Sequence, residues 1–234
     1  MGEMTDKRQT STGQCAFCGG TFGKAAISRH LRACKQRAAL AQATSSGRQP
    51  KHGQIYHLQV EGRHDPEYWL HLEVPGKATL ADLDQFLRDI WLECCGHLSA
   101  FSIDGVSYSS FPDSNLGFGP PERSMRVSLS KVLRPDLTFA YEYDFGSTTY
   151  LKLRVVGERE GTAKEKTVEI LARNSPPEIL CTKCEKPATQ VCTECLWSGG
   201  GWLCDQCLQE HECGDEMALP VVNSPRVGVC GYTG

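Results

Sequence analysis

The sequence predicts an α+β fold, in which a mostly antiparallel sheet is covered by one main helix and flanked by two small cysteine-rich modules. Apolar and polar residues alternate in several short runs between residues 55 and 155, as in half-buried strands. A single apolar stripe with helical spacing follows the second run. Thirteen cysteines, most of them in close pairs, lie mainly outside these runs. One helix against such a sheet is an α+β layer arrangement.

The first central elements are two strands and a helix. Residues 55–60 and 68–74 read as strands, and Pro75 with Gly76 ends the second. Thr79 is the expected N-cap of the helix, because Asp82 stands three positions later as its capping-box partner. The apolar stripe that should cover the sheet consists of Leu80, Leu83, Phe86, Leu87, Ile90 and Trp91.

The remaining central elements are strands joined by tight turns. Asp104-Gly105 between short alternating runs is a strong hairpin signal. Residues 139–145 and 151–155 should pair antiparallel around Gly146, and residues 167–171 offer a further strand. Residues 125–133 fit either a strand or a short helix.

Seven cysteines and one histidine crowd into the 33 residues from Cys181 to Cys213. Three Cys-x-x-Cys doublets carry the spacing that directs two thiolates at one tetrahedral ion, and a histidine and a cysteine follow them. Eight donors make two four-coordinate zinc sites, which are closed to water and therefore structural. The predicted ligands are Cys181, Cys184, Cys192, Cys195, Cys204, Cys207, His211 and Cys213.

Only seven residues separate Cys184 from Cys192, so an alternating assignment of the doublets is favoured. One zinc would then bind Cys181, Cys184, Cys204 and Cys207, and the other would bind Cys192, Cys195, His211 and Cys213. This pattern resembles the cross-braced zinc modules of the B-box and MYND type, which bind proteins. The alternative is a disulfide framework, which belongs to small secreted chains. The polar residues 1–12 show no export signal, so a reducing cytosol is expected.

A second metal motif lies near the N-terminus. Cys15 and Cys18 form a doublet, and His30 and Cys34 are four residues apart, so on a helix they share a face. Zinc must supply most of the folding energy of so short a segment. The motif resembles C2HC fingers and is similar to ubiquitin-binding zinc fingers of the DNA-repair type. A third zinc is therefore expected, bound by Cys15, Cys18, His30 and Cys34.

Positive charge is concentrated in the same region. Residues 1–52 contain nine Lys/Arg against two acidic residues, although the whole chain carries −3. This asymmetry favours attraction to polyanions, and the finger helix offers Arg29, Arg32, Lys35 and Arg37 as phosphate contacts. A solvated basic face is the alternative. Linker composition follows the finger in residues 41–53, so a tethered finger is expected.

The central region resembles a known family. The similarity rests on Ile55-Tyr-His-Leu, on Cys94-Cys-Gly-His-Leu-Ser-Ala-Phe101 and on Tyr141-Glu-Tyr-Asp-Phe-Gly146. These segments look like the plasmid ORF-three-like family, also labelled insertion-element passenger proteins. The resemblance covers residues 53–172, extends to the cysteine module, and implies the α+β fold and a bacterial or archaeal cytosolic setting. It implies no activity.

Catalysis by the central domain is a competing hypothesis. Cys94 or Cys95 lies close in sequence to His97, and Asp144 ends a predicted strand, so a nucleophile and its base are conceivable. A buried, inert cysteine is the more common outcome for such a residue. Cys230 has no doublet partner and is expected to replace Cys213 as a ligand, to remain a free thiol or to react.

These observations predict four segments: a basic C2HC finger at 1–40, a flexible linker at 41–53, an α+β domain at 54–175, and a two-zinc module with an apolar tail at 176–234. The favoured function is a non-catalytic zinc adaptor in the cytoplasm that recognises a macromolecule and is associated with mobile elements. Nucleic-acid binding through the finger and Cys/His catalysis are the alternatives. No apolar run reaches the roughly 18 residues of a membrane span, and the sequence does not indicate an oligomeric state.

Overall fold

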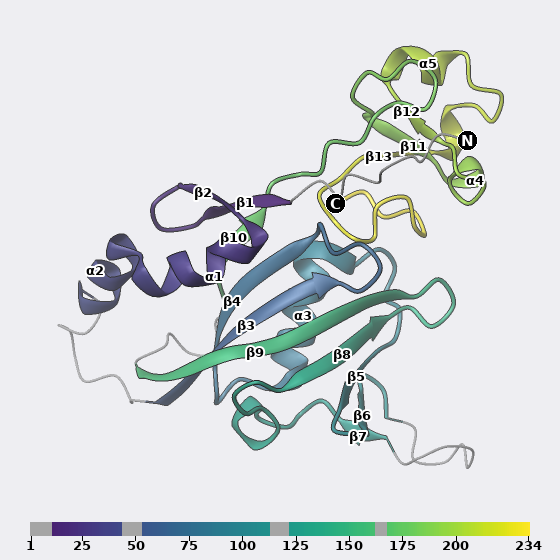
Figure 1. The fold of residues 1–234 in the computed structure, drawn as a ribbon. Helices are drawn as coiled ribbons and strands as arrows, with labels where there is room; N and C mark the ends of the chain where they lie inside the picture. Colours follow the sequence, from purple (N-terminus) through teal and green to yellow (C-terminus); the bar gives the residue numbers. More distant parts are fainter. Residues whose placement is uncertain (1–10, 44–52, 113–121, 162–167) are drawn as a thin grey trace, which may run out of the picture.

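The computed structural model describes residues 11–43, 53–112, 122–161 and 168–234. In these residues the chain is α+β, as the sequence predicts, with one large sheet and one small sheet (Figure 1). The strand order of the large sheet is β2-β1-β10-β4-β3-β9-β8-β5-β6-β7. Its pairings are antiparallel except for β6 with β7. Its strands are β1 (Thr12–Cys15), β2 (Thr21–Gly23), β3 (Gly53–Gly62), β4 (Trp69–Pro75), β5 (Ser99–Ile103), β6 (Val106–Ser109), β7 (Arg123–Ser124), β8 (Thr138–Tyr143), β9 (Thr149–Gly161) and β10 (Glu169–Asn174).

One helix covers a face of this sheet. Helix α3 (Leu80–Leu87) begins at Thr79 with the predicted capping box, because Thr79 and Asp82 each bond the other's backbone N–H. It continues into the π-helical turn η2 (Arg88–Leu92). The helix residues Leu83, Leu87 and Trp91 are fully buried in one core with strand residues that include Leu58 and Leu72.

The predicted hairpins are confirmed. Strands β5 and β6 pair around Asp104 and Gly105, whose φ values of 49° and 78° are those of a tight hairpin turn. Strands β8 and β9 pair antiparallel as expected. The ambiguous segment 125–133 holds a short helical turn, η3 (Leu129–Lys131), so its helical interpretation is correct.

The N-terminal finger is part of the large sheet, so the expectation of a tethered finger was wrong. Strand β1 pairs antiparallel with β10, and Ile27 and Leu31 of α1 (Lys24–Ala33) are buried in one cluster with Trp69. Gly13 allows this contact, because a Cβ there would collide with the Arg173 carbonyl and the Trp69 ring. Helix α2 (Lys35–Ala43) follows, and residues 44–52 of the expected linker lie outside the described residues.

The C-terminal module contains the small sheet, with strand order β12-β11-β13. Figure 1 shows this module standing beside the large sheet, with the last residues of the chain running between the two. Its elements are β11 (Gln190–Cys192), α4 (Thr193–Leu196), β12 (Trp202–Leu203), α5 (Asp205–Gln209), η4 (Asp215–Met217) and β13 (Ala218–Pro220).

Residues 221–234, here called the C-terminal tail, pack on both the domain and the module. Ser224 Oγ donates to the carbonyl of Trp91 at 2.7 Å, at the end of the main helix. A Cβ on Gly228 would press against Leu196 of the module. Tail packing was expected from its apolar composition, and the structure confirms it on both surfaces. Within the described residues, none of the helices combines the length and the apolar character needed to span a bilayer.

Candidate metal centres

Four groups of Cys and His side chains occur among the described residues, each with its four donor atoms within 4.8 Å of one another. All thirteen cysteines are free thiols, so the disulfide alternative does not apply. A tetrahedral ion with Zn–S distances of about 2.3 Å holds two sulfurs about 3.8 Å apart, whereas a disulfide holds them at about 2.05 Å. The sulfur–sulfur distances within the groups are 3.6–3.9 Å. This donor spacing suits a shared ion.

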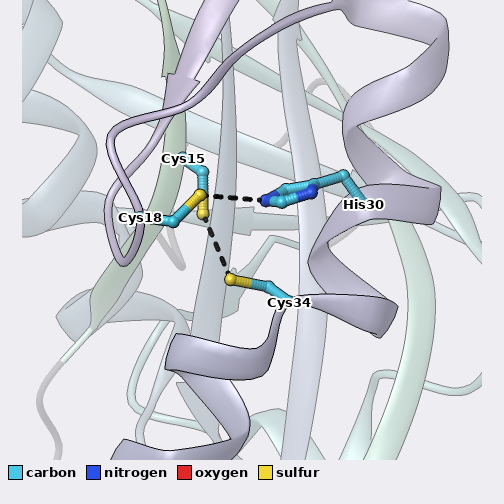
Figure 2. A group of neighbouring side chains, drawn as sticks. All are labelled: Cys15, Cys18, His30 and Cys34. Carbon is cyan, nitrogen blue, oxygen red and sulfur yellow. Dashed lines mark hydrogen bonds between the residues drawn. The ribbon is translucent and has the colours of Figure 1, made fainter.

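The finger group joins the end of a strand, a turn and a helix (Figure 2). Cys15 ends β1, Cys18 lies in the turn before β2, His30 projects from α1 and Cys34 caps that helix. The Cys15 and Cys34 sulfurs are 3.9 Å apart, and Cys18 Sγ lies 3.3 Å from His30 Nε2. The ring of Phe22 stacks on His30 at 3.8 Å and holds the imidazole in place.

Local backbone groups favour the thiolate form at Cys34. The backbone N–H of Arg37 lowers the pKa of the Cys34 thiol. Burial acts in the other direction at Cys15 and raises the pKa of its thiol. Metal binding requires deprotonated thiols, so a cation placed between these sulfurs would offset the cost at Cys15.

The C-terminal module holds two groups, and their membership is the alternating one expected from the sequence. Cys181, Cys184, Cys204 and Cys207 form the first, with Cys184 and Cys204 sulfurs 3.6 Å apart. Burial alone would raise the pKa of Cys181, but backbone N–H groups led by that of Cys204 lower it to about 6.

The second group of the module consists of Cys192, Cys195, His211 and Cys213. Cys195 Sγ lies 3.6 Å from both His211 Nε2 and Cys213 Sγ. Burial would raise the pKa of Cys192, but the backbone N–H of Cys195 and other donors bring it down to about 7. Both groups therefore contain a buried cysteine that is poised to ionise.

The fourth group was not predicted from the sequence. It brings Cys94, Cys95 and His97, which lie between η2 and β5, together with Cys230 of the C-terminal tail. Of the three outcomes considered for Cys230, replacement of Cys213 is excluded by this position. The expectation of a buried cysteine also fails, because Cys95 is exposed and Cys94 is half-buried.

Comparison with known proteins identifies the central region. A family model described as plasmid pRiA4b ORF-3-like protein matches residues 54–180. The chain belongs to this family. The match spans β3 to β10 and ends at residue 180, immediately before Cys181, so all the predicted ligands of the C-terminal module lie outside it.

Among solved structures, the ORF-3-like chain is similar to a protein of unknown function from Methanosarcina mazei Go1. The two share 22% identity with a TM-score of 0.42, over 51% of this chain and 68% of that one. No curated protein matches the chain significantly.

The residues considered for catalysis in the ORF-3-like domain do come together. Cys95 Sγ lies 2.9 Å from His97 Nε2, and the same nitrogen lies 3.5 Å from Asp144 Oδ2. A nucleophile, base and orienting acid need the two ring nitrogens separately, one for each partner. Here a single nitrogen faces both groups, and Asp144 is already paired with Arg226 at 2.7 Å. The arrangement is that of converging donors rather than a proton relay.

The four basic residues considered for phosphate contact separate into two kinds. Arg29, Arg32 and Lys35 are exposed on the finger. Arg37 instead forms an ion pair with the buried carboxylate of Glu73 and donates to the Leu31 carbonyl at 2.8 Å. Arg37 therefore helps to dock the finger on the sheet. The prediction that Arg37 contacts a phosphate was wrong.

Proposed function

We propose that this protein is a non-catalytic zinc-binding adaptor, in which three closed metal sites shape small modules that recognise a macromolecular partner. The observation that supports it is the donor count. The finger group and the two groups of the C-terminal module each offer four protein ligands to one point. A four-coordinate site of this kind keeps no position for water, so its metal builds structure.

Zinc K-edge X-ray absorption on the purified, reduced protein tests the closed sites. The three groups contribute sulfur and imidazole nitrogen alone, in the proportion of ten sulfurs to two nitrogens. The expected spectrum therefore contains Zn–S and Zn–N shells at about 2.3 and about 2.0 Å. A bound oxygen shell would overturn the proposal, because it would reveal an open position of the catalytic kind.

A protein partner is favoured by the apolar surface of the C-terminal module. Trp197, directly after α4, is 76% exposed, and Leu180 and Met217 of the same module are 48% and 41% exposed. Tryptophan is one of the residue types enriched among binding hot spots. We propose that this module contacts a protein through Trp197.

Site-specific photo-crosslinking in cells tests this contact. A photoreactive phenylalanine at position 197 should give one discrete adduct. The matched control is position 111, because Phe111 is a 68% exposed aromatic residue of the ORF-3-like domain. Equal adduct patterns at both positions, or none at 197, would remove the proposed surface.

Nucleic-acid binding is the second candidate, supported by the exposed cations of the finger. Arg29, Arg32 and Lys35 carry three positive charges on one short segment. Phosphate contacts release counterions, so affinity for duplex DNA or RNA should fall steeply with salt. Replacing the three residues by Gln should reduce the salt slope by about 3 for DNA. Fluorescence anisotropy at several salt concentrations measures this slope.

The control for that experiment removes the same charge from residues outside the finger. Arg123, Arg126 and Lys131 are also exposed and belong to β7 or to the segment after it. Their triple Gln variant should bind as the wild type does. Equal losses in both variants would mean that net charge, and not the finger, governs the association.

A reducing cytoplasm is the compartment we propose for this function. Thirteen free thiols, ten of them in the three groups above, require a setting in which cysteines stay reduced. The family description names a plasmid reading frame, which supports an association with mobile elements.

A further inference from the structure

The fourth Cys/His group joins two parts of the chain that are far apart in sequence. Cys94 and Cys95 follow the π-helical turn η2, and His97 precedes β5. Cys230 comes from the C-terminal tail, 135 residues after Cys95. The tail presents Cys230 with a φ of 50°, a left-handed conformation that is uncommon for a residue with a side chain.

The spacing of the donors matches that of the three groups described above. Cys95 Sγ lies 3.7 Å from Cys94 Sγ and 3.8 Å from Cys230 Sγ. These distances agree with the edges of about 3.8 Å in a tetrahedral thiolate site. His97 Nε2 is closer, at 2.9 Å from Cys95 Sγ and 3.2 Å from Cys230 Sγ. Around an ion the nitrogen–sulfur distance is about 3.6 Å, so binding would require the His97 ring to move away from both sulfurs.

The surroundings of the group suit an anionic metal site. Three thiolates and one imidazole around a divalent ion carry a net charge of about −1. Arg226, which is fully buried, donates to Cys94 Sγ at 3.4 Å and to Asp144 Oδ2 at 2.7 Å. Groups that hydrogen-bond to metal-binding side chains hold those side chains in place and compensate their charge. The Arg226 guanidinium thus offsets the thiolates as well as Asp144.

We propose that Cys94, Cys95, His97 and Cys230 bind a fourth zinc ion, which clamps the C-terminal tail to the ORF-3-like domain. Three thiolates and one imidazole are a donor set typical of structural zinc. The clamp acts on a tail whose Ser224 and Arg226 already contact the domain, and the tail directly follows the two-zinc module. The ion therefore fixes that module against the large sheet.

This site should exchange its metal before the others do. Cys95 and Cys230 are exposed, and Cys94 and His97 are only half-buried. Each of the other three groups contains at least one buried cysteine and no more than one exposed donor. Water and chelator can reach the Cys95 and Cys230 thiolates, so the ion bound to this group should be released first.

The test is elemental analysis of the full chain, purified under zinc-replete and reducing conditions, as wild type and as C230S. The wild type should hold four zinc ions and C230S three. The matched control is T233A, which alters an exposed residue of the same tail and should hold four. Hydrogen exchange should also show loss of protection in residues 221–234 of C230S alone. Equal zinc content in wild type and C230S would overturn the site.

A second measurement covers the case in which C230S is unstable. A chromogenic chelator added to the wild type should release one zinc in a fast phase and the rest slowly, and H97N should lack the fast phase. A single phase in the wild type contradicts the proposal. So does a Cys95–Cys230 disulfide found by mass spectrometry without reductant. Failure of the adaptor proposal would instead appear as missing zinc in the terminal groups, which C230S leaves intact.

Discussion

The buried ion pair between Arg226 and Asp144 should be the strongest single polar link between the tail and the ORF-3-like domain. Its side chains are 0% and 6% exposed, and the two groups lie 2.7 Å apart. The variant R226M keeps much of the volume and leaves Asp144 as a buried carboxylate without its cation. Removing one partner of a buried pair costs about 3–5 kcal/mol. Asp144 retains the Gly146 N–H at 3.0 Å, so the lower end, about 3 kcal/mol, is expected.

A double-mutant cycle separates the pair from the packing of the tail. D144N leaves Arg226 bonded to the Thr149 hydroxyl at 3.0 Å and to the Ser147 carbonyl at 3.2 Å, so it should cost less than R226M. The double variant should recover part of the loss, with a coupling energy of about 1–3 kcal/mol. Urea unfolding in excess zinc, followed by tryptophan fluorescence, measures the cycle. Additive single-variant effects, within about 0.5 kcal/mol, would refute a desolvated pair.

Three further predictions concern the sheet. His57 and His71 are buried, their rings share a hydrogen bond of 2.9 Å, and burial lowers their pKa values to about 4 and about 3. In the unfolded chain these two histidines bind protons below about pH 6.5, whereas in the folded chain they stay neutral until a much lower pH. The free energy of unfolding should therefore fall as the pH drops below 6.5, by about 2 kcal/mol per histidine at pH 5. Urea unfolding of H57Q should show a shallower fall. G13A should overpack the contact with Trp69, lower the free energy of unfolding by about 1–3 kcal/mol and raise hydrogen exchange in β1. In the control G23A the added methyl group meets open space, so neither the stability nor the exchange should change. C34S should lose the finger's metal, expose Trp69 and shift its emission to the red, a shift that should be absent when W69F is added to C34S.

Local signals in the sequence predicted most of the elements. Thr79 and Asp82 identify the start of the main helix because a capping box involves residues three apart. Asp104 and Gly105 specify their hairpin because the turn demands positive φ at both positions. The Cys-x-x-Cys doublets are equally local, and the structure groups them as the alternating assignment expects.

Contacts between distant residues escaped prediction. Strand β1, Thr12-Gly13-Gln14-Cys15, contains no large apolar side chain and so lacks the alternation that would identify a strand. The docking of the finger on β10 therefore had no sequence signal. The ion pair of Arg37 with Glu73 depends on that docking and was missed with it. The fourth group did leave a trace. Three cysteines remain after the predicted ligands are assigned: Cys94, Cys95 and Cys230. Together with His97 they make one further set of three cysteines and one histidine.

Because the finger lies at the end of the large sheet, the zinc proposed for it would link metal supply to solubility. Strands β2 and β1 stand between β10 and solvent, and β2 is only three residues long, so the native edge is short and bounded by the turn that carries Cys18. Unpaired strand edges are templates for intermolecular pairing. A chain starved of zinc would uncover the flank of β10, and newly made copies would be drawn into sheet-to-sheet aggregates before any partner is met.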